Sequence, residues 1–148
     1  MRNGIFLDSN MLIYSLDPTE PAKRAKAAEL LRRAIRADRL VLGPQTLNEC
    51  YRVLTDRRRI MPRTDARRFI RPLVSRCSAP GDASNLARAW EIQDATGFAW
   101  WDCLMLASAS RAGCSHFFTE DMEHGRVVHE MRLVDLFRDD TDLDSIVN

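Results

Sequence analysis

Four acidic residues are the candidates for chemistry in this sequence: Asp8, Glu49, Asp102 and Asp121. Carboxylates that converge on one point repel one another, so a dry cluster of them is stable only when protons or a cation neutralise it. Carboxylate oxygens select hard ions, Mg²⁺ or Mn²⁺ rather than zinc, and Mg²⁺ typically keeps several waters that a phosphate-bearing substrate can displace. A converged set would therefore suit metal-assisted phosphodiester hydrolysis.

Each of the four residues also has a simpler interpretation. Asp8 and Asp121 follow apolar runs, where an Asp commonly serves as a turn residue or helix N-cap. Asp102 stands inside the apolar segment 98–107, where an unpaired buried charge is costly, but it also fits the first turn of a helix, which the helix dipole stabilises. Glu49 lies about 200° around its helix from Leu47, on a side that is solvated by default. Spacing alone leaves these alternatives open.

Short apolar strands alternate with amphipathic helices along the chain. Apolar runs predict strands at 4–7, 40–42, 115–118 and, as a further candidate, 132–134. Helical periodicity together with Pro and Gly positions predicts six helices. The first ends before Pro18, and the next three begin at Pro21, Gly43-Pro44 and Pro62. The last two end at Gly97 and Gly113. Parallel strands need crossovers, so this order predicts a mainly parallel sheet covered on both faces by helices. Ligands of such sheets bind beyond the carboxyl ends of the strands, where Asp8 and Asp121 are expected.

Composition sets the broad class of protein. The 148 residues, 45% hydrophobic, suit one domain over 1–148, with 139–148 expected to be a flexible acidic tail because it carries four Asp and no cation. No run of about 18 apolar residues is present, and the first residues break apolarity too soon for a signal peptide, so we expect a cytoplasmic protein without membrane insertion. The four cysteines show no zinc or disulfide spacing, which favours reduced thiols.

The charge distribution is uneven although the net charge is only +1. Between Arg52 and Arg76 there are nine Arg and two Asp. Arginines at this density usually form a solvated helix face, and phosphate binding is the alternative. The three histidines are too scattered for a metal triad, while Met105 and the Trp100-Trp101 pair are expected in the core.

Several short segments together resemble the PIN-domain ribonucleases, and within them the VapC-type toxins of bacterial toxin–antitoxin pairs. They are Ile5-Phe6-Leu7-Asp8-Ser9-Asn10 with Leu12-Ile13-Tyr14, then Asn48-Glu49, then Trp101-Asp102-Cys103-Leu104 with Ala107-Ser108-Ala109, and finally Phe118-Thr119-Glu120-Asp121-Met122 with His124-Gly125. Each segment is weak alone, but the ordered set covers nearly the whole chain. The Trp pair and Cys103 depart from the family pattern without removing a carboxylate.

The resemblance implies an α/β fold, a three-layer α/β/α sandwich whose acidic residues bind Mg²⁺ or Mn²⁺ at the carboxyl edge of the sheet. Asp8 and Asp102 are the expected first ligands, joined by Glu49 and Asp121, with Glu120 a rival to Asp121. The resemblance further implies water attack on an RNA phosphodiester that leaves a 5′-phosphate and a 3′-hydroxyl, a homodimer, and a cognate antitoxin that inserts a segment across the groove.

Asn10 and Thr119 resemble the family's supporting groups, which hold the carboxylates by hydrogen bonds, although turn and cap roles fit them equally well. A haloacid-dehalogenase-type phosphatase needs a second acid two positions after Asp8, where Asn10 stands, and a receiver domain needs paired acids after the first strand. The stronger alternative is a non-catalytic PIN-like module that binds RNA or protein through the Arg52–Arg76 region.

Overall fold

A five-stranded sheet forms the centre of the fold, with strand order β2-β1-β3-β5-β4. The structure, a computed structural model, describes residues 3–147. The strands are β1 (Gly4–Leu7), β2 (Leu40–Val41), β3 (Cys114–Phe118), β4 (Val127–Val128) and β5 (Met131–Val134). β2, β1, β3 and β5 run parallel, and β4 pairs antiparallel with β5 at the edge. The carboxyl ends of four strands therefore meet at one edge of the sheet.

Alternating side chains of the strands build two hydrophobic cores, one on each face of the sheet. Ile5, Leu7 and Phe118 belong to one core, whereas Phe6 and Phe117 belong to the other. Phe6 and Phe117 are paired in register on neighbouring strands, and their rings stack with centroids 4.9 Å apart. Because successive residues of a strand point to opposite faces, continuous apolar runs such as Ile5-Phe6-Leu7 are buried on both sides.

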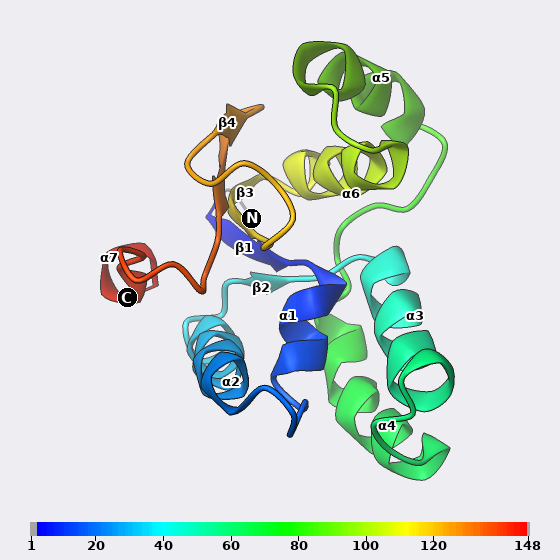
Figure 1. Cartoon of the computed structure of the whole chain (residues 1–148). Coiled ribbons are helices and arrows are strands. Elements are labelled where there is room, and N and C mark those ends of the chain that lie inside the picture. Colours follow the sequence, from blue (N-terminus) through cyan, green and yellow to red (C-terminus); the bar gives the residue numbers. More distant parts are fainter. Residues whose placement is uncertain (1–2, 148) are drawn as a thin grey trace.

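Helices cover both faces and confirm the predicted α/β/α layers (Figure 1). On one face lie α1 (Ser9–Tyr14), α2 (Pro21–Arg36), α3 (Pro44–Arg52), the π-helical turn η1 (Val53–Arg57), α4 (Arg63–Ile70) and the 3₁₀ turn η2 (Arg71–Arg76). On the other face lie α5 (Asn85–Thr96) and α6 (Trp100–Arg111). None of the helices within residues 3–147 is long and apolar enough to cross a membrane.

Pro and Gly bound the helices as the sequence predicts. Pro21 and Pro44 are the first residues of α2 and α3, where the missing N–H of proline has no helical partner to lose. Gly97 and Gly113 follow α5 and α6 with φ of 73° and 77°, a left-handed conformation that costs glycine little. No sequence pattern predicts the two-residue strand β4 or the irregular turns η1 and η2.

Part of the acidic C-terminal segment, which the sequence predicts to be a flexible tail over 139–148, contacts the rest of the fold. Its described part contains α7 (Leu143–Ile146), and Val147 is buried. Arg39 donates hydrogen bonds to the carbonyl oxygens of Asn3 (2.7 Å) and Ile146 (2.6 Å), so one guanidinium joins both ends of the described chain. Asn148 lies outside the described residues.

Candidate active site

Asp8 lies at the carboxyl end of β1, immediately before α1. It occupies the N-cap position of α1, but its side chain makes no capping hydrogen bond. Instead its two carboxylate oxygens accept hydrogen bonds from the hydroxyls of Ser9 (3.2 Å) and Thr119 (3.0 Å). Only 5% of the residue is exposed. The simple N-cap role therefore does not account for this buried carboxylate.

Thr119 and Asn10 connect the strand ends to the acidic residues. Thr119 directly follows β3 and is buried, and its Oγ1 also accepts a hydrogen bond from the Asp121 backbone N–H (3.2 Å). Asn10, in the first turn of α1, donates from Nδ2 to Asp121 Oδ2 at 2.8 Å. The two polar residues thus position Asp8 and Asp121 from opposite sides of the β1–β3 pair. Their geometry matches the supporting positions expected for them.

All four candidate carboxylates line one cleft of about 860 Å³. Asp102 enters it from the first turn of α6, and Glu49 enters it from α3. Glu49 is partly exposed and lies 3.7 Å from Arg57. The remaining lining residues are Ser9, Asn10, Gln45, Asn48, Arg52, Trp101 and Met105. The fold brings together residues that are far apart in the sequence; the strand-end argument predicts this for Asp8 and Asp121, and the resemblance implies it for Glu49 and Asp102.

Burial and charge repulsion raise the pKa values of two acids of the cleft, Asp8 and Asp102. Burial, with the charge of Asp102 adding to it, raises the pKa of Asp8 to about 6, although the Thr119 and Ser9 hydrogen bonds oppose the shift. Burial and then the charge of Asp121 raise the pKa of Asp102 above its usual range. The first-turn position expected for Asp102 is confirmed. The cleft therefore disfavours its own negative charge.

The donor set fits a hard divalent cation, although the geometry is open. Among residues 3–147, no three His, Cys, Asp or Glu side chains lie close enough to surround one ion. Mg²⁺ is usually bound by one or two carboxylates, with waters and substrate phosphates completing its shell. Asp8 and Asp102 repel each other through the cleft and offer only oxygen atoms, so a cation between them would relieve their repulsion. Such a site polarises phosphate oxygens and water.

Glu120, the rival of Asp121, faces a different set of partners. Its Oε2 accepts a hydrogen bond from Lys23 Nζ at 2.9 Å, and its Oε1 accepts one from the Tyr14 hydroxyl. The bond to Glu120 raises the pKa of Lys23 to about 12. Glu120 does not line the acidic cleft, whereas Asp121 does. The geometry thus favours Asp121 over Glu120 as the fourth acid.

Trp101 and Arg52 line the cleft, although neither was among the site residues expected from the sequence. The expectation that the two tryptophans are core residues is wrong for Trp101, which is 66% exposed, while Trp100, the first residue of α6, packs against the core. Met105 is buried, as expected, and also reaches the cleft wall. Helix α6 is apolar nearly all round, so its periodicity could not show which aromatic side chain faces solvent. Arg52 follows Glu49 by three residues, a spacing that places both on one helix face.

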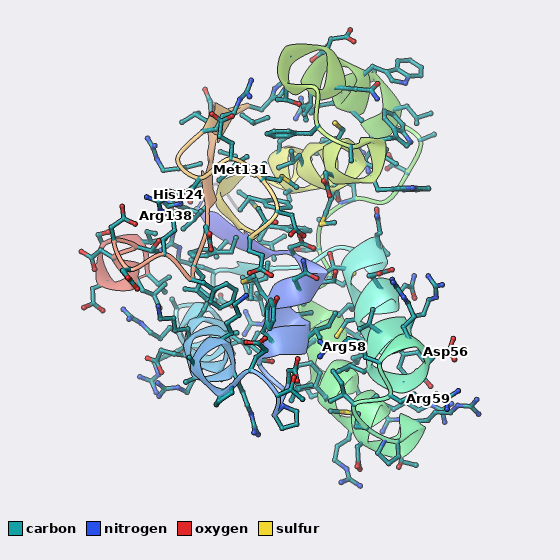
Figure 2. All side chains as sticks on the ribbon, viewed as in Figure 1. Asp56, Arg58, Arg59, His124, Met131 and Arg138 are labelled. Atoms are coloured by element: carbon teal, nitrogen blue, oxygen red, sulfur yellow. The ribbon has the colours of Figure 1, made fainter. Side chains whose placement is uncertain are left out.

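Most arginines of the 52–76 region have acidic or aromatic neighbours. Arg58 pairs with buried Asp17 at 2.6 Å, and Arg76 pairs with Asp38. Arg67 Nε donates to the Tyr51 hydroxyl at 3.1 Å. Figure 2 shows Arg58 toward α1, while Arg59 lies at the outer edge of the molecule. The region is therefore mainly a solvated, internally paired surface, and Arg52 is its member at the acidic cleft.

The strands and helices that carry these residues fall within a match to a known protein family. A family model described as PIN domain matches residues 5–130 of the chain. The matched range contains Asp8, Glu49, Asp102 and Asp121 together with Asn10 and Thr119. No curated protein matches the chain.

Proposed function

This chain belongs to the PIN-domain family, and from that premise we propose that it is a metal-dependent ribonuclease that uses Asp8, Glu49, Asp102 and Asp121. PIN domains are generally Mg²⁺- or Mn²⁺-dependent nucleases, and PIN nucleases act on RNA. The observation that carries the proposal is the buried carboxylate of Asp8, which has two hydroxyl partners and a repelling acid, Asp102, across the cleft. A divalent cation would offset the charge of both carboxylates.

The proposed role of each residue, metal ligand or positioning group, follows from its place in the cleft. Asp8 and Asp102 would hold the cation, and Glu49 and Asp121 would complete the acidic wall. When bound, the cation offsets the charge that develops on the phosphate and lowers the pKa of an attacking water. Thr119 fixes one oxygen of Asp8, and Asn10 fixes one oxygen of Asp121. Hydrogen bonds of this kind keep carboxylates in the orientation that a metal requires.

Two further residues of the cleft suit a nucleic acid. Arg52 offers a guanidinium beside the carboxylates, where it can pair with a phosphate that would otherwise meet only negative charge. Trp101 exposes its ring at the cleft, and exposed aromatic rings stack on unpaired bases. These contacts hold RNA against the acids without requiring a highly basic protein.

A non-catalytic RNA- or protein-binding module is the second candidate. It would use the 52–76 region, but several arginines there already pair with Asp17, Asp38 or Tyr51. A binding module also gains nothing from carboxylates that repel a phosphate. The enzyme therefore accounts for more of the structure.

Cleavage of a 5′-labelled structured RNA by the purified full chain tests the proposal. We expect cleavage with Mg²⁺ or Mn²⁺ that chelator abolishes, and products with 5′-phosphate and 3′-hydroxyl ends. Asp102→Asn should lose more than the about 10–100-fold that outer-shell changes cost. Asp139→Asn, at an exposed acid outside the cleft, is the matched control and should retain the parent rate. RNA binding without cleavage under all these conditions would favour the binding module.

We also propose that the chain is the toxin of a toxin–antitoxin pair, acting in the cytoplasm as a homodimer. The ordered resemblance to VapC-type toxins supports this role, and the acidic cleft suits an antitoxin segment with a basic side chain. Induction in growing cells should arrest growth for the parent and not for Asp102→Asn. Light scattering should give twice the chain mass of 17.0 kDa. A small antitoxin-like reading frame beside the gene would supply the partner, whereas growth without arrest would contradict the toxin role.

A further inference from the structure

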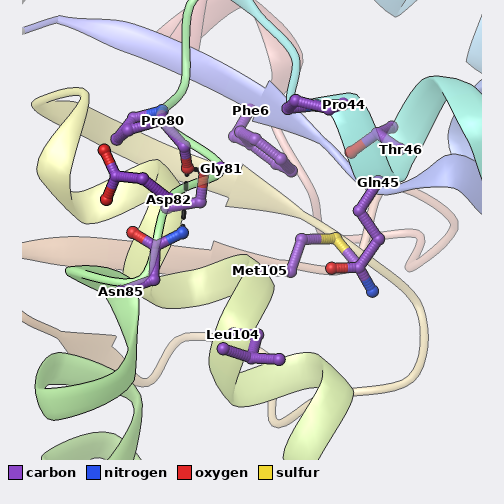
Figure 3. Close-up of a pocket in the computed structure, with 12 residues that line it drawn as sticks. Phe6, Pro44, Gln45, Thr46, Pro80, Gly81, Asp82, Asn85, Leu104 and Met105 are labelled. Carbon is purple, nitrogen blue, oxygen red and sulfur yellow. Dashed lines mark hydrogen bonds between the residues drawn. The ribbon is translucent and has the colours of Figure 1, made fainter.

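A second, smaller cavity adjoins the acidic cleft. It has a volume of about 170 Å³ and lies between the first turn of α3, α6 and the segment that leads into α5 (Figure 3). Gln45 and Met105 line both the cavity and the cleft. Gln45 precedes Glu49 by four residues and Met105 follows Asp102 by three, so the cavity begins one helical turn from two of the acids. A chain lying in the cleft can therefore extend a side group into this cavity.

One buried polar group in the cavity wall has no partner. The Thr46 hydroxyl, in the first turn of α3, makes no hydrogen bond within the described structure, and Thr46 is 0% exposed. Buried hydroxyls are nearly always hydrogen-bonded, so an exception calls for an explanation. A ligand whose polar edge entered the cavity could supply the missing bond after a small adjustment of the wall. The adjacent Gln45 amide offers both a donor and an acceptor for the same edge.

The other lining polar groups are already engaged. Asn85 donates to the Pro80 carbonyl at 2.9 Å and accepts a bond from Arg111, and Ser108 also donates to the Pro80 carbonyl. The carboxylate of Asp82 pairs with Arg111 at 2.7 Å. Among residues 3–147, no lysine or arginine lines the cavity, and Asp82 is its charged member. An anion such as phosphate is therefore disfavoured.

The remaining walls are apolar and suit a flat ring. They come from Phe6, Pro44, Pro80, Leu104 and Met105. A cavity of about 150 Å³ accepts one benzene ring in a protein, so this volume admits a ring of similar size. The ligand that fits such walls has two apolar faces and an edge with hydrogen-bond donors and acceptors. An unpaired nucleobase has these properties.

We propose that this cavity is a base-binding subsite, in which one unpaired base of the RNA inserts beside Met105 and hydrogen-bonds to Gln45 and Thr46. The inference rests on the proposed ribonuclease function, because it takes RNA as the ligand of the neighbouring cleft. The subsite selects where the RNA is cut, since it fixes one base about one helical turn from the carboxylates.

The test observes Met105 directly in the full chain, without metal. The ε-methyl of Met105 is followed by NMR in methyl-¹³C-methionine protein, assigned with Met105→Leu, with chelator present. Adenosine, guanosine, cytidine and uridine 5′-monophosphates are titrated separately, and ribose 5-phosphate is the control. We expect a saturable ring-current shift of the Met105 methyl with at least one nucleotide and none with ribose 5-phosphate, because only a base carries the aromatic ring.

Two variants separate recognition from packing. Thr46→Val keeps the side-chain shape and removes the unpartnered hydroxyl, so it should weaken nucleotide binding about two- to tenfold while the protein is at least as stable as the parent. Gly43→Ala adds a methyl group in ordinary contact with Phe6 and Ser108, both 3.7 Å away, and should reduce binding by narrowing the cavity. A purely structural Thr46 would instead leave binding unchanged.

Two outcomes of the titration would overturn the base-binding subsite. An unshifted Met105 methyl with all four nucleotides at millimolar concentration overturns the subsite, as does an equal shift with ribose 5-phosphate. Because the titration excludes metal, it is independent of cleavage: a base-dependent shift in a protein that cuts no RNA would refute the nuclease and retain the subsite. RNA cleavage without a base-dependent shift would retain the nuclease and refute the subsite.

Discussion

Thr119 holds Asp8 across two neighbouring strands: its hydroxyl donates a 3.0 Å hydrogen bond to Asp8 Oδ2. The same hydroxyl accepts the backbone N–H of Asp121 at 3.2 Å. Thr119 follows β3 and Asp8 follows β1, which pair in parallel with Leu7 opposite Phe118. One buried hydroxyl thus fixes the relative positions of two acids that come from opposite ends of the sequence.

Thr119→Val should impair RNA cleavage while leaving the fold intact. The substitution keeps the branched shape but removes the donor to Asp8 and the acceptor for the Asp121 amide. Losses of about 10–100-fold are typical when a partner of a metal ligand is removed. Cleavage rates at saturating Mg²⁺, with circular dichroism to check folding, measure the effect. Thr119→Ser keeps the hydroxyl and should recover most of the activity, so equal rates for the Val and Ser variants would contradict the positioning role.

Asp8→Asn should stabilise the metal-free protein at neutral pH. The pKa of Asp8 rises from 3.8 to about 6 on folding, so its contribution to stability is fully present below pH 3.8 and is lost as the pH rises through about 6. That loss amounts to at most ~3 kcal/mol. Urea unfolding in chelator should therefore show a gain for the variant at pH about 7.5 that shrinks at pH about 4. A variant destabilised equally at both values would refute the buried-charge argument.

Asp121→Asn and Glu120→Gln should have opposite consequences. Asp121 lines the cleft, so its amide variant should lose cleavage with little change in stability. Glu120 pairs with partly exposed Lys23, so its amide variant should lose up to ~1 kcal/mol of unfolding free energy and retain cleavage. Parallel rate and urea-unfolding measurements on the two proteins decide the assignment. A cleavage loss for Glu120→Gln alone would transfer the fourth acidic role to Glu120.

Arg52→Gln should weaken RNA binding and flatten its salt dependence. Arg52 lines the acidic cleft, and one lost phosphate contact lowers the slope of log K against log salt by about 1. Fluorescence anisotropy of labelled RNA over a salt series, in chelator to prevent cleavage, measures this slope. Arg68→Gln is the matched control because Arg68 is 83% exposed and lies beside Asp65 on α4. Identical slopes for both variants would place the phosphate contact elsewhere.

The elements that carry the site could be predicted because their signals are local. Ile5-Phe6-Leu7 is buried on both sides of a parallel sheet, and such strands read as continuous apolar runs. Pro44 begins α3 because its ring fixes φ near the helical value. Gly97 ends α5 because glycine can adopt a positive φ. Asp8 and Asp121 could be assigned to one sheet edge once parallel strands were inferred. The convergence of Glu49 with them was an expectation that spacing alone could not decide.

Other features depend on tertiary contacts that no local pattern encodes. Trp101 and Trp100 are neighbours in an apolar helix, and only the packing of α6 against the sheet exposes the first and covers the second. The packing of the acidic C-terminal segment depends on Arg33 and Arg39, more than a hundred residues away, which donate to the carbonyls of Val147 and Ile146. The unpartnered hydroxyl of Thr46 is likewise visible only when all its neighbours are placed.

Mn²⁺ binding followed by electron paramagnetic resonance tests the central claim most directly, because it observes the cation without requiring RNA or turnover. The parent protein and Asp139→Asn should bind Mn²⁺ saturably and release it to excess Mg²⁺. Asp8→Asn and Asp102→Asn should each lose that binding while remaining folded. Saturable binding of equal strength in all four proteins, or none in the parent, would contradict a cation site built on Asp8 and Asp102.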